Sequence, residues 1–334
     1  MLEGLTLTLL AVFGLAVLFD YVNGFHDTAN AIATSVSTRA LRPEYAILLS
    51  AVANFIGALT GTAVAKTVAS GIVVAPGGHD GQVVVAGALI GAIFWNLFTW
   101  RLGIPSSSSH ALIGGLLGAV AVSSGVGAWQ LDGIFYKVLV PLVGSPVIGL
   151  VVGFGFMVLL LNLFRRADPH SLNSTFRRLQ VLSASYMAFG HGSYDAQKTM
   201  GIMTLALFSA GLIPTTDVPV WVILLAASAI SAGTAAGGWR IIRTVGQRVV
   251  KLDPVHGFAA ETTAATVILT ASHFGVPVST THVISSAIIG VGSSDRFSAV
   301  RWGIAGDIVV AWVLTIPASA LVAGAAYAIL RAFL

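Results

Sequence analysis

Two polar stretches inside long apolar runs decide the fold: NGFHD at residues 23–27 and HGSYD at residues 191–195. Each has glycine in second place and ends on an aspartate. A second pair of motifs follows, because GIPSSSSH at 103–110 is matched by GVPVSTTH at 275–282. The chain therefore carries the same two motifs in the same order in each half. In a membrane protein, duplicated halves with polar breaks at corresponding positions indicate a transporter whose site lies between the halves.

The composition indicates a membrane protein. Of the 334 residues, 56% are hydrophobic and 9% are charged, and the mean hydropathy is +0.90. Soluble domains carry roughly 25% charged residues. The sequence has no cysteine, so disulfides and thiolate metal sites are excluded. The N-terminal apolar run has no Lys or Arg before it and no evident small-residue cleavage site, so we interpret it as a first span rather than a signal peptide.

The apolar runs predict an all-α polytopic protein. A span needs roughly 20 residues, and the first run, with its polar stretch in the middle, is too long for one simple crossing. The runs are at 5–37, 44–71, 83–101, 106–123, 133–162, 179–211, 219–238, 255–273, 278–292 and 300–330.

The basic residues predict the orientation. Lys and Arg gather in the connections at 39–42, 165–178, 240–251 and 296–301, and are missing from those at 72–82, 123–132 and 212–218. By the positive-inside rule the first group is cytoplasmic and the second external. Five runs in each half then invert the second half relative to the first, and both termini are extracytoplasmic.

This topology divides the chain into a first repeat at 1–164, a cytoplasmic linker at 165–178 and a second, inverted repeat at 179–334. The net charge of +4 and the isoelectric point near 9.6 could suggest a nucleic-acid partner. Topology markers that face anionic lipid headgroups explain them better, so we expect the lipid bilayer as partner and no nucleic acid.

The proline-serine motifs predict anion-binding helix starts. Proline followed by serine favours the beginning of a helix, and helix N-termini bind anions through free N–H groups. The runs on either side of Pro105 are predicted to form a re-entrant hairpin, although charge parity also allows two full crossings. A matching hairpin surrounds Pro277. The alternative is that these hydroxyls only cap or join helices.

The aspartate motifs predict a second part of the site. Asp27 and Asp195 lie in the middle of apolar segments, where a carboxylate is costly and usually functional. The neighbouring glycines, Gly24 and Gly192, would permit an unwound backbone whose carbonyls bind a cation. The alternatives are an N-cap role for Asp27 and simple neutralisation of Asp195 by Lys198.

For three further polar residues within apolar runs, the sequence allows either a role in the site or a structural role. Glu261 is a third acid, which fits either a site or a solvated position near the membrane interface. His110 and His282 follow the Ser/Thr clusters at matched positions, and either support the site or donate hydrogen bonds between helices.

With these four motifs in order, nearly the whole chain resembles the inorganic phosphate transporter family, often called PiT. The resemblance rests on NGFHDTANA at 23–31, PSSSSH at 105–110, GSYDAQK at 192–198 and PVSTTH at 277–282. It implies uptake of phosphate driven by a cation gradient, two inverted repeats and extracellular termini at the cell membrane. It is also consistent with a homodimer.

The chain departs from the family's usual Gly-Ala-Asn-Asp core. His26 and Tyr194 replace the two asparagines, and Lys198 stands at the position that matches Asn30. The first-half form resembles the bacterial branch of proton-coupled, metal-phosphate carriers. The coupling ion, H⁺ or Na⁺, and the form of the substrate therefore stay open.

We predict a secondary active transporter with no cofactor. The predicted phosphate ligands are Asp27, Ser107, Ser108, Ser109, Asp195, Ser279, Thr280 and Thr281. The predicted coupling-cation residues are Asn23, His26, Asp27, Asn30, Asp195 and Lys198. The predicted metal ligands are Asp27, Asn30 and Asp195.

Three alternatives to phosphate transport are less favoured. A carrier of another divalent oxyanion such as sulfate is less favoured, because sulfate has no proton to donate to a carboxylate. An anion channel would need polar residues along whole spans. An enzyme is not expected, because Ser109 and His110 are adjacent and would not face each other on a helix, and the sequence has no zinc-protease motif.

Overall fold

The computed structural model describes residues 7–68, 72–74 and 76–333. Within them the protein is helical, without a strand beyond an isolated bridge between Val73 and Trp129. The helices are α1 (Leu7–Ser37), α2 (Pro43–Ala58), α3 (Ala63–Val68), α4 (Gly78–Leu102), α5 (Ser108–Ser124), α6 (Leu131–Ile134), α7 (Val140–Leu163), α8 (Pro169–Ser209), α9 (Val220–Ala236), α10 (Trp239–Arg243), α11 (Pro254–His273), α12 (Thr280–Asp295) and α13 (Trp302–Phe333).

The helices follow the predicted apolar runs closely. Within the described ranges, four helical segments are long and apolar enough to cross a membrane: α1, α4, residues 131–163 and α13. A fifth span is possible if α9 and the segment 239–248, which are bent by 60° to each other, count as one. The prediction of an all-α membrane protein is confirmed, while the inverted repeats and re-entrant hairpins stay predictions. The helix α8 begins at Pro169, so the predicted linker at 165–178 is largely helical.

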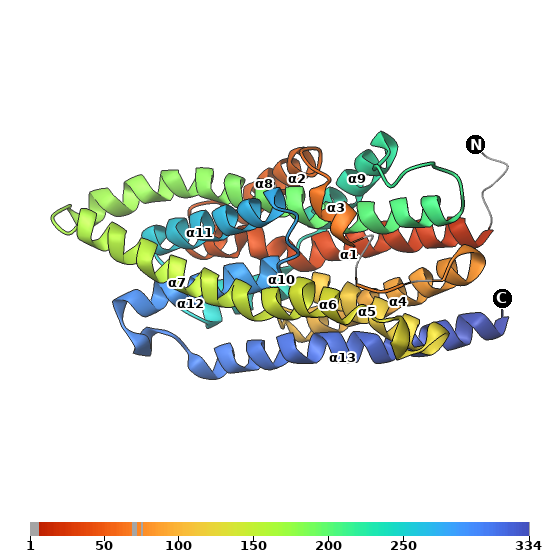
Figure 1. The fold of residues 1–334 in the computed structure, drawn as a ribbon. Helices are drawn as coiled ribbons and strands as arrows, with labels where there is room; N and C mark the ends of the chain where they lie inside the picture. Colours follow the sequence, from red (N-terminus) through yellow and green to blue (C-terminus); the bar gives the residue numbers. More distant parts are fainter. Residues whose placement is uncertain (1–6, 69–71, 75, 334) are drawn as a thin grey trace.

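The ends of the helical bundle are consistent with the predicted orientation. The start of α1 and the end of α13 lie at one end of the bundle, and the connection between α7 and α8 lies at the other (Figure 1). The topology relative to a membrane stays a prediction.

The two aspartate motifs do not unwind, contrary to expectation. Gly24 lies inside the continuous helix α1 and Gly192 inside α8. A Cβ atom on Gly24 would lie 2.1 Å from the carbonyl oxygen of Ile230 in α9, and one on Gly192 would lie 2.1 Å from that of Asn54 in α2. These glycines therefore allow two helices to cross at backbone contact, as small residues do in membrane proteins. The helix break lies instead between α9 and α10.

The two halves of the chain pack against each other in matched pairs. Helix α1 of the first half packs on α9, and α8 of the second half packs on α2. In the same way α5 packs on α13 and α12 on α7. Motif residues that lie far apart in the sequence are thereby brought together in the interior.

Apolar side chains cover the outside, while polar side chains gather inside. Leu48, Val151 and Leu314 are at least half exposed. The polar residues of both aspartate motifs and of both Ser/Thr clusters are buried. This distribution suits a protein surrounded by lipid, where polar groups face the interior of the bundle.

Candidate functional site

The site is built on the starts of α5 and α12. The hydroxyl of Ser107 accepts a hydrogen bond of 3.2 Å from the backbone N–H of His110, and Ser279 does the same for His282. Both are N-caps with nearly identical extended backbones. The sequence folds this way because a serine N-cap satisfies one of the free N–H groups of the first turn. The remaining N–H groups and the helix dipole favour an anion.

Each helix start faces the aspartate of its own half. Ser108 Oγ donates a hydrogen bond of 3.3 Å to Asp27 Oδ2, and Thr280 Oγ1 donates one of 3.2 Å to Asp195 Oδ2. A bond between halves also forms, because Asn30 Nδ2 donates to Thr281 Oγ1 at 2.9 Å. Both motifs of both halves therefore meet in one place.

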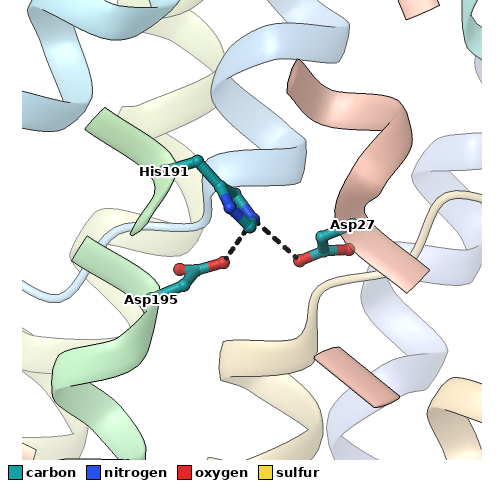
Figure 2. A group of neighbouring side chains, drawn as sticks. All are labelled: Asp27, His191 and Asp195. Carbon is teal, nitrogen blue, oxygen red and sulfur yellow. Dashed lines mark ion pairs between the residues drawn. The ribbon is translucent and has the colours of Figure 1, made fainter. Parts of the chain in front are cut away.

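His191 lies between the two aspartates. Its Nε2 atom is 2.9 Å from Asp195 Oδ2 and 3.9 Å from Asp27 Oδ2 (Figure 2). The Nδ1 atom lies 3.2 Å from the amide oxygen of Asn54, so Nδ1 donates and orients the ring. One ligand atom from each of Asp27, His191 and Asp195 lies within 4.8 Å of the other two. Two carboxylates and an imidazole at this spacing can hold a divalent metal ion.

Each aspartate also has a basic neighbour from its own helix. His26 Nδ1 lies 2.6 Å from Asp27 Oδ1, and Lys198 Nζ donates a hydrogen bond to Asp195 Oδ1. Lys198 Nζ also lies 4.8 Å from the centre of the Tyr194 ring, and the Tyr194 hydroxyl donates to the carbonyl of Val278 at 2.8 Å. The two residues that replace the asparagines of the usual family core therefore make different contacts. His26 contacts Asp27, whereas Tyr194 is hydrogen-bonded to the segment before α12.

All the predicted site residues are buried, and most of them converge. Ser109 follows the contact residues in the first turn of α5, and the Asn23 amide forms no hydrogen bond with any described residue. The buried set is Asn23, His26, Asp27, Asn30, Ser107, Ser108, Ser109, Asp195, Lys198, Ser279, Thr280 and Thr281.

Sequence reasoning missed His191 as a site residue, although it is the first residue of the HGSYD motif. Its spacing of four from Asp195 on one helix was the signal that could have found it, because such residues share a face.

The structure places the three polar residues whose role the sequence left undecided. Glu261 accepts hydrogen bonds from Thr34 and Ser183, so it joins α11 to α1 and α8 as a buried acid rather than a solvated one. The rings of His110 and His282 contact each other, with centroids 4.9 Å apart. They lie in the first turns of α5 and α12 and join the two helix starts.

Comparisons with known proteins identify the family of the chain. A family model described as "Phosphate transporter family" matches residues 23–323. The chain belongs to this family. A probable low-affinity inorganic phosphate transporter of Bacillus subtilis (strain 168) is 48% identical over 328 residues, covering 98% of both chains. One of Rhizobium meliloti (strain 1021) is 50% identical over 321 residues, covering 96% of this chain and 95% of the relative.

A solved structure supports the same family. The chain is similar to the sodium-dependent phosphate transporter, with a TM-score of 0.86 and 27% identity, covering 98% of this chain and 100% of the other. The resemblance inferred from the motifs is confirmed, and the relatives are named as transporters rather than enzymes. With its apolar helices, the chain is a membrane protein of this transporter family.

Proposed function

We propose that the chain is a secondary active transporter that imports inorganic phosphate, driven by a gradient of H⁺ or Na⁺. This proposal rests on one observation: the N-termini of two helices and two buried aspartates lie together around His191. The helix starts supply N–H and hydroxyl donors for an anion. Asp27 and Asp195 can accept a hydrogen bond from the hydroxyl group that phosphate still carries at neutral pH, whereas sulfate has no such proton to donate.

The proposed phosphate ligands are Ser107–Ser109 and Ser279–Thr281, with Asp27 and Asp195. Ser107 and Ser279 accept the capping bonds with their oxygens, so their hydroxyl protons stay available to an anion. Ser108 and Thr280 donate to the aspartates in this structure and would turn toward phosphate when it binds. All these residues are nearly inaccessible to solvent, which suits an occluded state of a transport cycle.

Transport requires access to this site from each side in turn. We propose that the inverted repeats, residues 1–164 and 179–334, rock against each other, with both termini extracytoplasmic and the linker cytoplasmic. Supporting this proposal, each half contributes one helix start, one aspartate and one crossing glycine. We also propose a homodimer, and its only support is the resemblance to the family.

The two halves are proposed to couple to cations differently. Lys198 donates to Asp195 and supplies a positive charge where a symmetric carrier would bind a second Na⁺. In the first half, the imidazole of His26 rather than a lysine contacts the aspartate, at 2.6 Å from Asp27 Oδ1. Lys198→Asn should therefore increase the dependence of uptake on Na⁺, and unchanged Na⁺ dependence would contradict the role given to Lys198.

A second candidate substrate is a metal-phosphate complex. The observation that favours it is the cluster of Asp27, His191 and Asp195, whose ligand atoms lie within 4.8 Å of one another. Asn30 was predicted as a further ligand, and its Oδ1 atom has no hydrogen-bond partner among the residues described. The metal would then be cargo and would enter with the anion.

The test is uptake of radiolabelled phosphate into proteoliposomes. Na⁺ is present or absent, the external pH takes two values, and Mg²⁺ is supplied or removed with EDTA. We expect accumulation driven by one cation gradient and little competition from excess sulfate. Dependence on Mg²⁺ would select the metal-phosphate form. Absence of accumulation under every gradient, or equal competition by sulfate, would refute phosphate import.

A further inference from the structure

Four arginines surround a small cavity at the end of α4, which we call the arginine pocket. Its volume is about 140 Å³, and its lining includes Arg101, Arg240, Arg243 and Arg248 but no acidic residue. All four arginines are exposed, and none of them forms an ion pair with a carboxylate in residues 7–68, 72–74 and 76–333. Like charges around one cavity repel one another, so an anion bound there would stabilise the arrangement.

Contacts within the protein already hold part of the arginine pocket in place. The guanidinium of Arg240 lies 5.0 Å from the centre of the Trp100 ring and donates a hydrogen bond to the carbonyl of Arg101. Beside it, Thr244 Oγ1 donates to the carbonyl of Gly103 at 2.7 Å. These contacts join the end of α4 to α10 and the segment that follows it. A positive group that is fixed in advance binds its ligand at a lower entropic cost.

An apolar cavity of about 480 Å³ adjoins the arginine pocket. It lies between the end of α4 and the first half of α13, and Leu102, Gly103, Thr244 and Arg248 line both cavities. Most of its other lining side chains are aliphatic or aromatic. Asp307 is the one acidic residue in the lining of the two cavities, so four arginines stand against a single carboxylate.

The apolar cavity has the depth of one leaflet of a bilayer. Its lining along α13 extends from Ile304 to Leu314, and ten residues of helix are about 15 Å long. The hydrocarbon core of a bilayer is about 30 Å thick. Val310 and Leu314 are at least half exposed, and α13 lies along an edge of the bundle (Figure 1). The cavity therefore faces the acyl chains of surrounding lipids.

The arginine pocket stands at the headgroup end of this cavity. Three of its arginines come from the connection at 240–251, which the basic residues predict to be cytoplasmic. The cytoplasmic leaflet is the one that carries an excess of anionic lipids, and each Lys or Arg near its surface contributes to their attraction.

We propose that the arginine pocket and the apolar cavity together bind one anionic phospholipid of the cytoplasmic leaflet, with its phosphate among the arginines and an acyl chain along α13. Guanidinium groups bind phosphate oxygens through two parallel hydrogen bonds. A free phosphate ion would leave the apolar cavity empty. A phosphatidylcholine would bring its own positive charge against the arginines.

This lipid site is separate from the proposed phosphate site but adjoins the turn that leads to it. Gly103, Ile104 and Pro105 line the apolar cavity, and Ser107 caps α5 two residues later. The carbonyl of Pro105 accepts a hydrogen bond of 3.1 Å from Trp312 Nε1 of α13. A lipid in this place would keep the turn packed between α10 and α13.

The experiment measures lipid binding to the detergent-purified protein by native mass spectrometry, with dioleoyl phosphatidylglycerol and dioleoyl phosphatidylcholine as probes. We expect tighter binding of phosphatidylglycerol. The double variant Arg243→Gln, Arg248→Gln should bind it about 30-fold more weakly. The matched control is Arg177→Gln, Arg178→Gln, because these two arginines of α8 are also exposed but line neither cavity.

Two further variants separate charge from folding and a lipid from a soluble anion. Arg243→Lys, Arg248→Lys keeps the charge and should retain most of the affinity for phosphatidylglycerol. Val310→Trp narrows the apolar cavity and should weaken the binding of this lipid at least about tenfold, with the arginines intact. Excess inorganic phosphate should not displace the lipid from the parent protein.

Four results would overturn the lipid site. Parental affinity of the double glutamine variant is the first, and an equal loss in the Arg177 and Arg178 control is the second. Equal affinity of the parent protein for both lipids is the third. Displacement of phosphatidylglycerol by inorganic phosphate, with parental affinity in Val310→Trp, is the fourth, and it would assign the arginines to a soluble anion. None of these measurements involves phosphate uptake, so a failure of phosphate import is recorded separately.

Discussion

The replacement of His191 by glutamine gives the sharpest test of the central cluster. Glutamine keeps similar length and hydrogen-bonding ability but cannot carry a positive charge. His191 lies between two carboxylates whose facing oxygens are within 4.8 Å of each other. Two unit charges 4.8 Å apart repel by about 3.5 kcal/mol at an effective dielectric constant of about 20. Without His191 this repulsion opposes the entry of a further anion.

We therefore expect His191→Gln to weaken phosphate binding at pH 7.5 by at least about tenfold. The full repulsion corresponds to about 300-fold, which is an upper bound because a proton or water can partly replace the imidazole. Lowering the pH to 5.5 should restore part of the loss, since a proton on one carboxylate removes the repulsion.

The assay is equilibrium binding of radiolabelled phosphate to purified protein at both pH values. The control is His170→Gln, because His170 lies on the same helix but is exposed and should behave like the parent. Parental affinity of His191→Gln at pH 7.5 would refute the reasoning, as would a loss that does not change with pH.

Three further predictions concern other parts of the structure. Ser108→Ala and Thr280→Ala should each weaken phosphate binding about 10- to 100-fold with unchanged unfolding temperature; no change in either would remove them as ligands. Asp27→Asn should abolish concentrative uptake in proteoliposomes, and accumulation against a gradient would place coupling elsewhere. Gly24→Ala should lower stability by about 1–3 kcal/mol because its Cβ would meet a carbonyl of α9 at 2.1 Å. Thermal unfolding tests this against Gly14→Ala, where nothing lies within 4 Å.

The helices could be predicted well because the apolar runs are long and the breaks between them are polar. The helix starts could be predicted too, since a serine or threonine shortly after a proline has a local preference for the N-cap of a helix. Gly24 was misread because glycine permits both an unwound backbone and a close helix crossing. The choice depends on Ile230, which lies on another helix and gives no local signal.

The site could be predicted only in part for the same reason. Asp27 and Asp195 stand out because carboxylates are rare in apolar runs. The bond from Asn30 to Thr281 joins opposite halves of the chain, and no spacing along the sequence reveals it.

The contact between His110 and His282 has a consequence for how such a chain can evolve. The two residues hold equivalent places in the two motifs, so each ring meets its own counterpart. A half-length ancestor that paired with a second copy of itself would place one histidine against the same histidine of its twin. In that ancestor every substitution would have changed both sides of the site together. Once both copies were joined in one gene, Asn30 and Lys198 could differ, and one half could specialise in charge while the other kept a neutral amide.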